Sequence, residues 1–146
     1  MKPFLFFFIA LTLALNSLAQ IISINPSGET SFKDKLGIQN NSVDGKKEGK
    51  WICYFDSLWQ PTTENKALYY RLTQYKDGKE YGIVYDYYFS GQIQKKCLFV
   101  EGKEKGIAKF FYESGKLSSE INYIEGKKEG VQKWYSEKGI LKMELP

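Results

Sequence analysis

The stretches that decide the fold read GKEYG at residues 78–82, GKEKG at 102–106 and GKKEG at 126–130, so they return at a step of 24 residues. Other positions keep the same step, namely Gly91, Gly115 and Gly139; Tyr75, Phe99 and Tyr123; and Ile93, Leu117 and Leu141. Agreement in several registers at one period is typical of a repeat architecture. We therefore interpret most of the chain as copies of one unit.

Each unit contains two turn signals, which predicts two strands per unit. One signal is an acidic residue followed by glycine, as in Asp77-Gly78, and the other resembles Ser90-Gly91. Glycine supplies the positive φ that tight hairpin turns need. Between the turns apolar and polar residues alternate, which favours strands. The sequence predicts an all-β fold: a single antiparallel β-meander of about eight strands, built from 24-residue hairpin repeats, elongated and free to curl. The strands are expected near 50–56, 67–75, 82–89, 92–100, 106–113, 116–124, 130–136 and 140–145.

An earlier, imperfect copy begins at Asp44-Gly45 and contains Trp51 and Tyr54. Its two halves are separated by an extra nine residues within 56–66, which include Trp59 and read as a surface loop. This insertion is the main departure from the repeat, so we predict that a partner binds there.

A two-residue loop at Ser90-Gly91 would fix the register of the sheet. The predicted pairs are Tyr88 with Ile93, Asp86 with Lys95, Val84 with Cys97, Tyr112 with Leu117, Ala108 with Ile121 and Trp134 with Met143. One face is then mostly apolar, and the other is polar with a line of Tyr87, Phe111 and Tyr135 across it. The apolar face needs a cover, for which three alternatives stay open: the sheet curls with residues 21–38 across it, a second copy packs on it, or a foreign partner does.

The N-terminal residues predict export. Lys2 is followed by an apolar run at 4–15 and by Ser17-Leu18-Ala19, which is typical of a secretory signal with cleavage before Gln20. We expect a signal peptide at 1–19, a linker or strand segment at 20–42 and the repeat domain at 43–146. The mature chain should be periplasmic, in the outer envelope or extracellular, in a bacterium.

The charge disfavours nucleic acid as a partner. Without Lys2 the chain keeps 20 Lys and Arg against 17 Asp and Glu, a net charge of about +3 from the full value of +4. Acidic and basic residues are interleaved in the turns, so no single-sign surface is expected.

Two cysteines, Cys53 and Cys97, are expected to stay free and half-buried. The predicted strands place them three strands apart, about 14 Å, whereas a disulfide needs Cα atoms within about 7 Å.

Catalysis is not expected. The chain has no histidine, which removes the commonest general base and metal ligand at neutral pH. The carboxylates of the turns lie next to lysines, where ion pairing is the simpler role. The sequence predicts no catalytic, cofactor-binding or metal-binding residue and no cofactor.

The repeat resembles the MORN-repeat variants of the bacterial type called antitoxin YwqK-like. The resemblance rests on Gly45-Lys46-Lys47-Glu48-Gly49-Lys50-Trp51 and on the three later GKxxG stretches with their aromatic pairs, and it covers residues 43–145. One departure is that the tryptophan after the second glycine survives only as Trp51, whereas Trp134 is displaced by two positions. The resemblance implies contacts with proteins or membranes and, for some members, a role as immunity partner of a secreted toxin.

We therefore predict an exported, non-enzymatic protein-interaction module, with an immunity or antitoxin-like role as its narrower form. The alternative is a membrane-surface or envelope scaffold that binds lipid through aromatic residues and Lys46, Lys47, Lys127 and Lys128. The partner is an unidentified protein, with a membrane surface and a homo-oligomer left open. The predicted partner-binding residues are Trp51, Tyr54, Trp59, Tyr87, Phe111, Trp134 and Tyr135.

Overall fold

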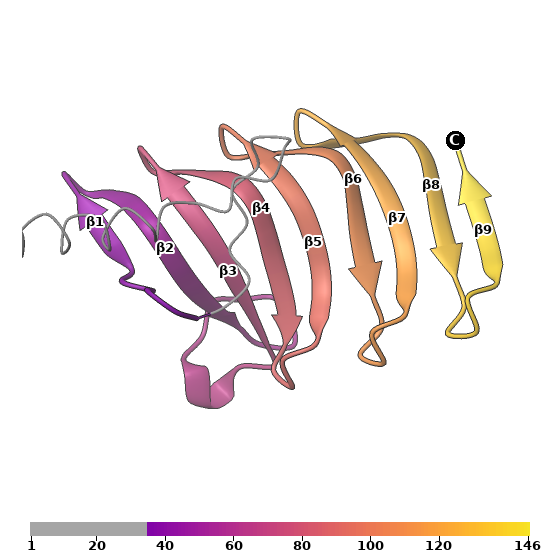
Figure 1. Cartoon of the computed structure of the whole chain (residues 1–146), viewed down its shortest axis with the longest axis horizontal. Coiled ribbons are helices and arrows are strands. Elements are labelled where there is room, and N and C mark those ends of the chain that lie inside the picture. Colours follow the sequence, from indigo (N-terminus) through magenta and orange to yellow (C-terminus); the bar gives the residue numbers. More distant parts are fainter. Residues whose placement is uncertain (1–34) are drawn as a thin grey trace, which may run out of the picture. The chain divides into compact units, whose positions relative to one another are not determined.

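The computed structural model describes residues 35–146, which form one sheet of nine antiparallel strands in chain order (Figure 1). The strands are β1 (Asn41–Val43), β2 (Lys46–Phe55), β3 (Tyr69–Lys76), β4 (Lys79–Tyr88), β5 (Ile93–Val100), β6 (Lys103–Phe111), β7 (Leu117–Ile124), β8 (Lys127–Tyr135) and β9 (Leu141–Leu145). The sheet does not close, so β1 and β9 are its edges. The predicted β-meander is confirmed, with β1 as a ninth strand at the end of the segment that was expected to be a linker or a strand. The predicted signal peptide and residues 20–34 lie outside the described residues.

The acidic-glycine turns are the tightest reversals in the sheet. Glu101 has a φ of 53° and Gly102 a φ of 78°, which is the type I′ geometry that suits the twist of paired strands. The Gly102 N–H donates to the carbonyl of Glu80, near the start of β4, at 2.9 Å, and the Gly126 N–H donates to the carbonyl of Glu104, near the start of β6, at 2.9 Å. Because the turn uses only two residues, β4, β6 and β8 begin three residues earlier than predicted.

The second glycine of each GKxxG stretch lies inside a strand. Gly106 has a φ of 75°, and the pairing of β5 with β6 shifts between Lys96 opposite Lys109 and Leu98 opposite Lys105. β6 thus has two extra residues between these pairs, which is an irregular β-bulge, and a bulge bends the strand and increases its twist. The repeat therefore bends each hairpin at a fixed place.

Substituting Gly106 tests this bend. An added Cβ would meet no atom within 4 Å, so the cost comes from the φ of +75° alone. We expect Gly106→Ala to lower the free energy of unfolding by about 1–2 kcal/mol, and Gly106→Asn to cost clearly less because asparagine tolerates positive φ. Urea unfolding of both variants measures the difference. Equal costs, or no cost for alanine, would contradict the assignment.

The other hairpin loop differs from the prediction. Tyr88 donates its N–H to Gln92 at 2.9 Å, and Gly91 donates to Tyr88 at 2.9 Å, so the loop has three residues with glycine in the left-handed conformation. Tyr87, not Tyr88, therefore opposes Ile93, whereas Asp86 with Lys95 and Val84 with Cys97 are confirmed. The same shift makes Phe111, not Tyr112, the partner of Leu117, whereas Ala108 with Ile121 and Trp134 with Met143 are as predicted.

The two sheet faces carry different clusters. Face A, defined as the side of Val84 and its cross-strand partner Cys97, holds the buried cluster of Val84, Cys97, Phe99, Ala108, Ile121 and Tyr123. Face B, the opposite side, holds Tyr70, Leu72, Tyr85 and Tyr87, because neighbouring residues of a strand point to opposite sides. Ile93 packs with this second cluster. Ile93 and Leu117 were predicted on the apolar face, and the longer loop with its compensating bulge moves both to face B.

Residues 35–40 lie beside β2 and contact face B. Ile38 packs against the Tyr70 cluster, and the Asn40 side chain donates to the Ile52 carbonyl at 3.2 Å and accepts from the Ile52 N–H at 2.9 Å. Residues 35–38, the described part of the segment that was predicted to cover the apolar face, therefore lie on face B and not on face A. The remainder, residues 21–34, lies outside the described residues.

Tyrosine hydroxyls connect consecutive units. Tyr88 donates to the Phe111 carbonyl at 2.9 Å, and Tyr112 donates to the Tyr135 carbonyl at 2.6 Å. These bonds repeat at the period of the sequence and tie each hairpin to the next.

Candidate interaction surface

The seven predicted binding residues do not form one site. The register places Trp51 and Trp134 on face A and Tyr54, Tyr87, Phe111 and Tyr135 on face B, whereas Trp59 lies in the insertion beside Phe55 and Tyr69. A single partner would therefore contact only some of them.

At least five of these seven aromatic residues have contacts within the chain, namely Trp51, Tyr54, Trp59, Tyr87 and Tyr135. The Trp51 ring lies edge-on to Tyr75 at 5.8 Å, and its indole N–H donates to the Asn41 and Glu48 carbonyls at 3.1 and 3.0 Å. Tyr87 is only 5% exposed and stacks on Tyr70 at 4.8 Å. Trp59 stacks on Tyr69 at 4.8 Å. These contacts within the chain explain why aromatic residues stand at positions 51 and 87, without invoking a partner.

The insertion is held against the sheet by these rings and by a turn. Asp56 accepts from the backbone N–H groups of Leu58 and Gln60 at 2.8 and 3.0 Å. Trp59 has a φ of 58°, and the neighbouring Leu58 is 75% exposed. The insertion therefore presents Leu58 to solvent and turns Trp59 inward onto Tyr69.

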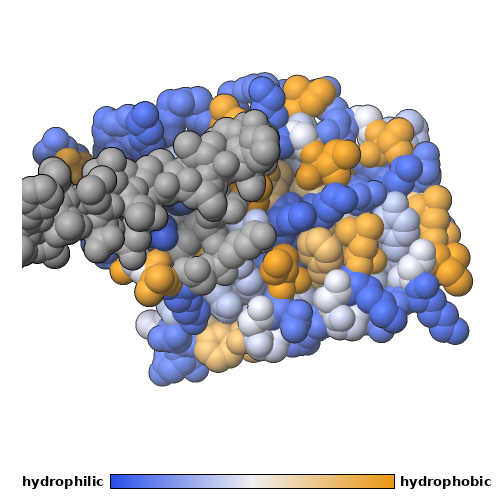
Figure 2. Space-filling view, in the orientation of Figure 1, coloured by the Kyte–Doolittle hydropathy of each residue, from blue (hydrophilic) through white to orange (hydrophobic). Residues whose placement is uncertain are grey.

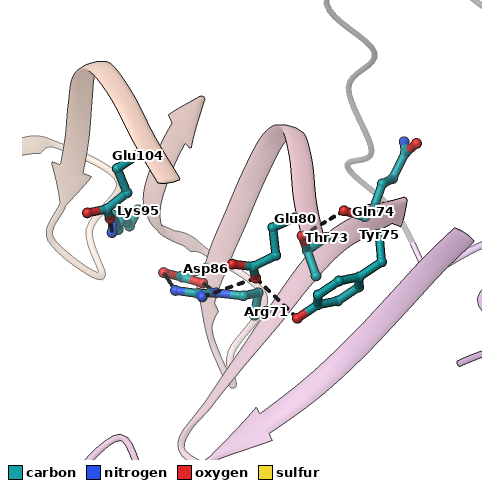
Figure 3. A network of polar contacts seen from close by, with 8 residues as sticks. All are labelled: Arg71, Thr73, Gln74, Tyr75, Glu80, Asp86, Lys95 and Glu104. Atoms are coloured by element: carbon teal, nitrogen blue, oxygen red, sulfur yellow. Dashed lines mark hydrogen bonds and ion pairs between the residues drawn. The ribbon is translucent and has the colours of Figure 1, made fainter. Parts of the chain in front are cut away.

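A network of charged side chains crosses the N-terminal half of face A (Figure 3). Arg71 donates to both carboxylate oxygens of Asp86, at 2.6 and 3.0 Å, and lies 3.4 Å from Glu80. Lys95 pairs with Glu104, which repeats the Arg71–Glu80 arrangement one unit later. The side chains of Arg71, Asp86 and Lys95 are 21%, 3% and 13% exposed, so this network is part of the interior and each charge in it has an oppositely charged neighbour.

The two thiols are unreactive by position. Both cysteines are free, as predicted, but Cys97 is 3% exposed and so more deeply buried than expected. Burial raises the pKa of Cys97 to about 11 and raises that of Cys53. Because the unfolded thiol ionises first, this contributes to a loss of stability as the pH rises above about 9.

Alkylation tests that assignment. At pH 8 we expect iodoacetamide to modify Cys97 at least about 100-fold more slowly in the native chain than in urea, because only the exposed thiolate reacts. Mass spectrometry of the peptide that contains Cys97 gives both rates. Similar rates in the two states would show that the thiol is accessible.

A row of alternating charges crosses the C-terminal half of face B. We call Lys109, Glu120, Lys133 and Glu144 the charge row; consecutive members are cross-strand partners on β6, β7, β8 and β9. Lys109 lies 3.0 Å from Glu120, and Lys133 lies 3.7 Å from Glu144. The Lys109 hydrogen bond lowers the pKa of Glu120 against the opposing effect of burial, so this carboxylate stays charged.

Apolar side chains lie on both sides of the charge row. Val100, Ile107, Ile124 and Val131 lie towards the acidic-glycine turns and are 42%, 60%, 50% and 49% exposed; Leu141, on the other side, is 47% exposed next to Tyr135. Figure 2 shows the result as a hydrophilic band with hydrophobic patches on either side. An open groove of about 500 Å³ lies here, lined by Ile107, Glu120, Asn122, Val131, Lys133 and Glu144.

This surface was not predicted from the sequence, although the predicted strand pairs already implied a row of opposite charges. The confirmed pairs Ala108 with Ile121 and Trp134 with Met143 imply that Lys109 opposes Glu120 and Lys133 opposes Glu144. Of the predicted residues only Phe111 and Tyr135 border the row; the Tyr135 hydroxyl donates to Glu120 at 3.1 Å.

Metal binding finds no support in the part of the chain that the structure describes. Among residues 35–146 no three His, Cys, Asp or Glu side chains lie together in a way that could hold a metal ion. The same residues contain no helix long and apolar enough to cross a membrane.

Comparison with known families agrees with the repeat geometry. The profile of the family described as the MORN repeat variant matches residues 80–101, 104–125 and 128–146. These three segments coincide with the hairpin units of β4 to β9, so the repeats in this part of the chain are similar to the MORN repeat variant. Such repeats are generally non-enzymatic modules that contact proteins or membranes. No curated protein and no solved structure matched the chain.

Proposed function

We propose that the chain is an exported protein-interaction module that meets its partner through face B of β6 to β9. The observation that supports this is the charge row with exposed apolar side chains on both sides. Folded chains seldom expose several large apolar side chains together unless the patch is an interface. Charged groups beside such a patch select partners and fix their alignment more than they add affinity.

Two exposed apolar residues allow a matched test. Ile107 lies in the groove on face B and is 60% exposed, whereas Leu58 lies in the insertion and is 75% exposed. The mature chain, Ile107→Glu and Leu58→Glu would be immobilised and used to capture proteins from an envelope extract. We expect Ile107→Glu to lose the captured protein and Leu58→Glu to keep it. The reverse result would move the site to the insertion.

The narrower form of the proposal is an immunity or antitoxin-like role. Its support is the resemblance of the repeat alone, so the test is the activity of the captured protein. The immunity role predicts a toxin whose activity the mature chain suppresses at equal molar ratio. Capture of a non-toxic envelope protein would be consistent with an interaction module and would contradict the immunity role.

A membrane-surface scaffold is the competing function. In its favour, Lys46, Lys47, Lys127 and Lys128 all follow acidic-glycine turns at one edge of the hairpins. Against it, the intervening turns carry ion pairs, Lys79 with Glu101 at 2.7 Å and Lys103 with Glu125 at 3.1 Å. Binding to anionic vesicles at low salt with release at high salt would support the scaffold; no binding at either salt would exclude it.

A further inference from the structure

The order of charges in the charge row has a symmetry that bears on the partner. From β6 to β9 the row reads plus, minus, plus, minus: Lys109, Glu120, Lys133, Glu144. Reversing this order gives minus, plus, minus, plus. Each charge of the row therefore meets an opposite charge when the row faces its own reversed copy.

We infer that a second copy of the chain binds this surface, related to the first by a two-fold axis that runs parallel to the strands between β7 and β8. The inference rests on the proposed function and names the partner of the same face. Lys109 then faces the Glu144 position of the second copy, and Glu120 faces its Lys133 position. Each side chain keeps its own-chain neighbour and gains a second counter-charge across the interface.

Other alignments of two copies are unfavourable. An axis along β7 or β8 places like charges opposite one another, and an axis between β6 and β7 brings Lys96 of β5 against Lys133. An axis that runs along the row, across the strands, places every charge on itself. Like charges in contact disfavour association. An axis between β8 and β9 also pairs Lys133 with Glu144, but it overlaps only two strands of each copy. The axis between β7 and β8 is therefore the one that pairs all four charges of the row.

The same axis also covers apolar side chains beside the row. A rotation about an axis parallel to the strands exchanges β6 with β9 and β7 with β8 and leaves the position along the strand unchanged. Val131 therefore lies over the Asn122 position of the second copy, and Ile107 lies over the end of its β9. Aligned sheet-on-sheet packing of this type is common. Four strands of about eight residues cover about 19 Å by about 26 Å, roughly 500 Å² on each copy. The total of about 1,000 Å² lies at the lower limit for a specific interface, so a weak dimer is expected.

Charge reversal gives a direct test by analytical ultracentrifugation of the mature chain. The row side chains Lys109, Lys133 and Glu144 are 42%, 40% and 48% exposed and Glu120 is 24% exposed, so reversal should leave the fold intact. We expect wild type to dimerise, and Lys133→Glu and Glu120→Lys each to raise the dimer dissociation constant at least about tenfold. Lys128→Glu, the same charge change on face A opposite Tyr123, should have no effect. Dimerisation should weaken as the salt concentration rises from roughly 50 mM to roughly 500 mM, a range that includes physiological ionic strength.

Mixing the two reversal variants excludes misfolding as the cause. In a pair made of one Lys133→Glu chain and one Glu120→Lys chain, all four facing charge pairs are opposite again, so the equimolar mixture should regain the wild-type dissociation constant. No recovery in the mixture, or a wild-type chain that stays monomeric, would overturn the inference. If wild type is monomeric while Ile107→Glu still abolishes capture, the interaction module stands and only the second copy is wrong. If neither effect is seen, both fail.

Discussion

Replacing Phe99 by alanine is expected to lower the free energy of unfolding by about 3–4 kcal/mol, the usual cost of deleting a buried aromatic side chain. Phe99 is 6% exposed and belongs to the face A cluster with Val84, Cys97 and Ala108. It lies opposite Gly82 on β4, which has no side chain, and opposite Glu104 on β6.

The matched control for Phe99 is Ile107→Ala. Ile107 lies on β6, next to β5, but on face B and 60% exposed. Its truncation should change the free energy of unfolding by less than about 0.5 kcal/mol, as for surface substitutions in general. Equal losses for the two variants in urea unfolding would mean that face B over these strands is as well covered as face A.

Replacing Asp86 by alanine is expected to cost about 3 kcal/mol. The Asp86 side chain is 3% exposed and accepts two hydrogen bonds from Arg71. Its removal leaves the guanidinium half-buried with only Glu80 at 3.4 Å, and loss of one partner from a buried pair leaves an uncompensated charge. The expected value is at the lower end for such losses because Arg71 is 21% exposed.

Glu101→Ala is the control for this second prediction. Glu101 pairs with Lys79 at 2.7 Å, but these side chains are 73% and 57% exposed, and exposed ion pairs contribute little to stability. We expect no measurable loss, and salt should not change the difference between the two variants. A similar cost for Asp86→Ala and Glu101→Ala would show that the face A network is solvated.

The sequence predicted the features that depend on period and side-chain alternation. The 24-residue unit, both turn positions and the pairs Asp86 with Lys95 and Val84 with Cys97 are confirmed. These features follow from glycine placement and from the two-residue period of a strand, both of which are local.

The bulges could not be predicted in the same way. Gly106 and Gly102 both have positive φ, and a glycine pattern alone does not tell a turn from a bulge. The three-residue loop after Tyr88 was missed for the same reason, and its extra residue shifts only the strand ends. Beyond the compensating bulge the register returns to the predicted one, so the central pairs were predicted correctly. Only Ile93 and Leu117, close to the loops, were assigned to the wrong face.

The candidate surface was only partly foreseen because the choice of aromatic residues ignored internal packing. Trp51 and Tyr87 are aromatic and regularly placed, yet both are occupied by contacts within the sheet. The charge row uses ordinary lysine and glutamate residues, and its meaning appears only once four strands are aligned. A surface of this kind is visible in the sequence as opposite charges at paired positions, not as unusual residue types.

The most direct test of face B as the binding surface is site-specific photo-crosslinking in the producing cell. A photoreactive residue would replace Ile107 or Val131 in the groove, Trp134 on face A, or Ile140, which is 63% exposed at the rim and serves as the control. The account predicts crosslinked products from Ile107 and Val131 that are absent from Trp134 and Ile140, and their mass identifies a second copy or another protein. Products from Trp134 alone, or none from either groove position, would contradict it.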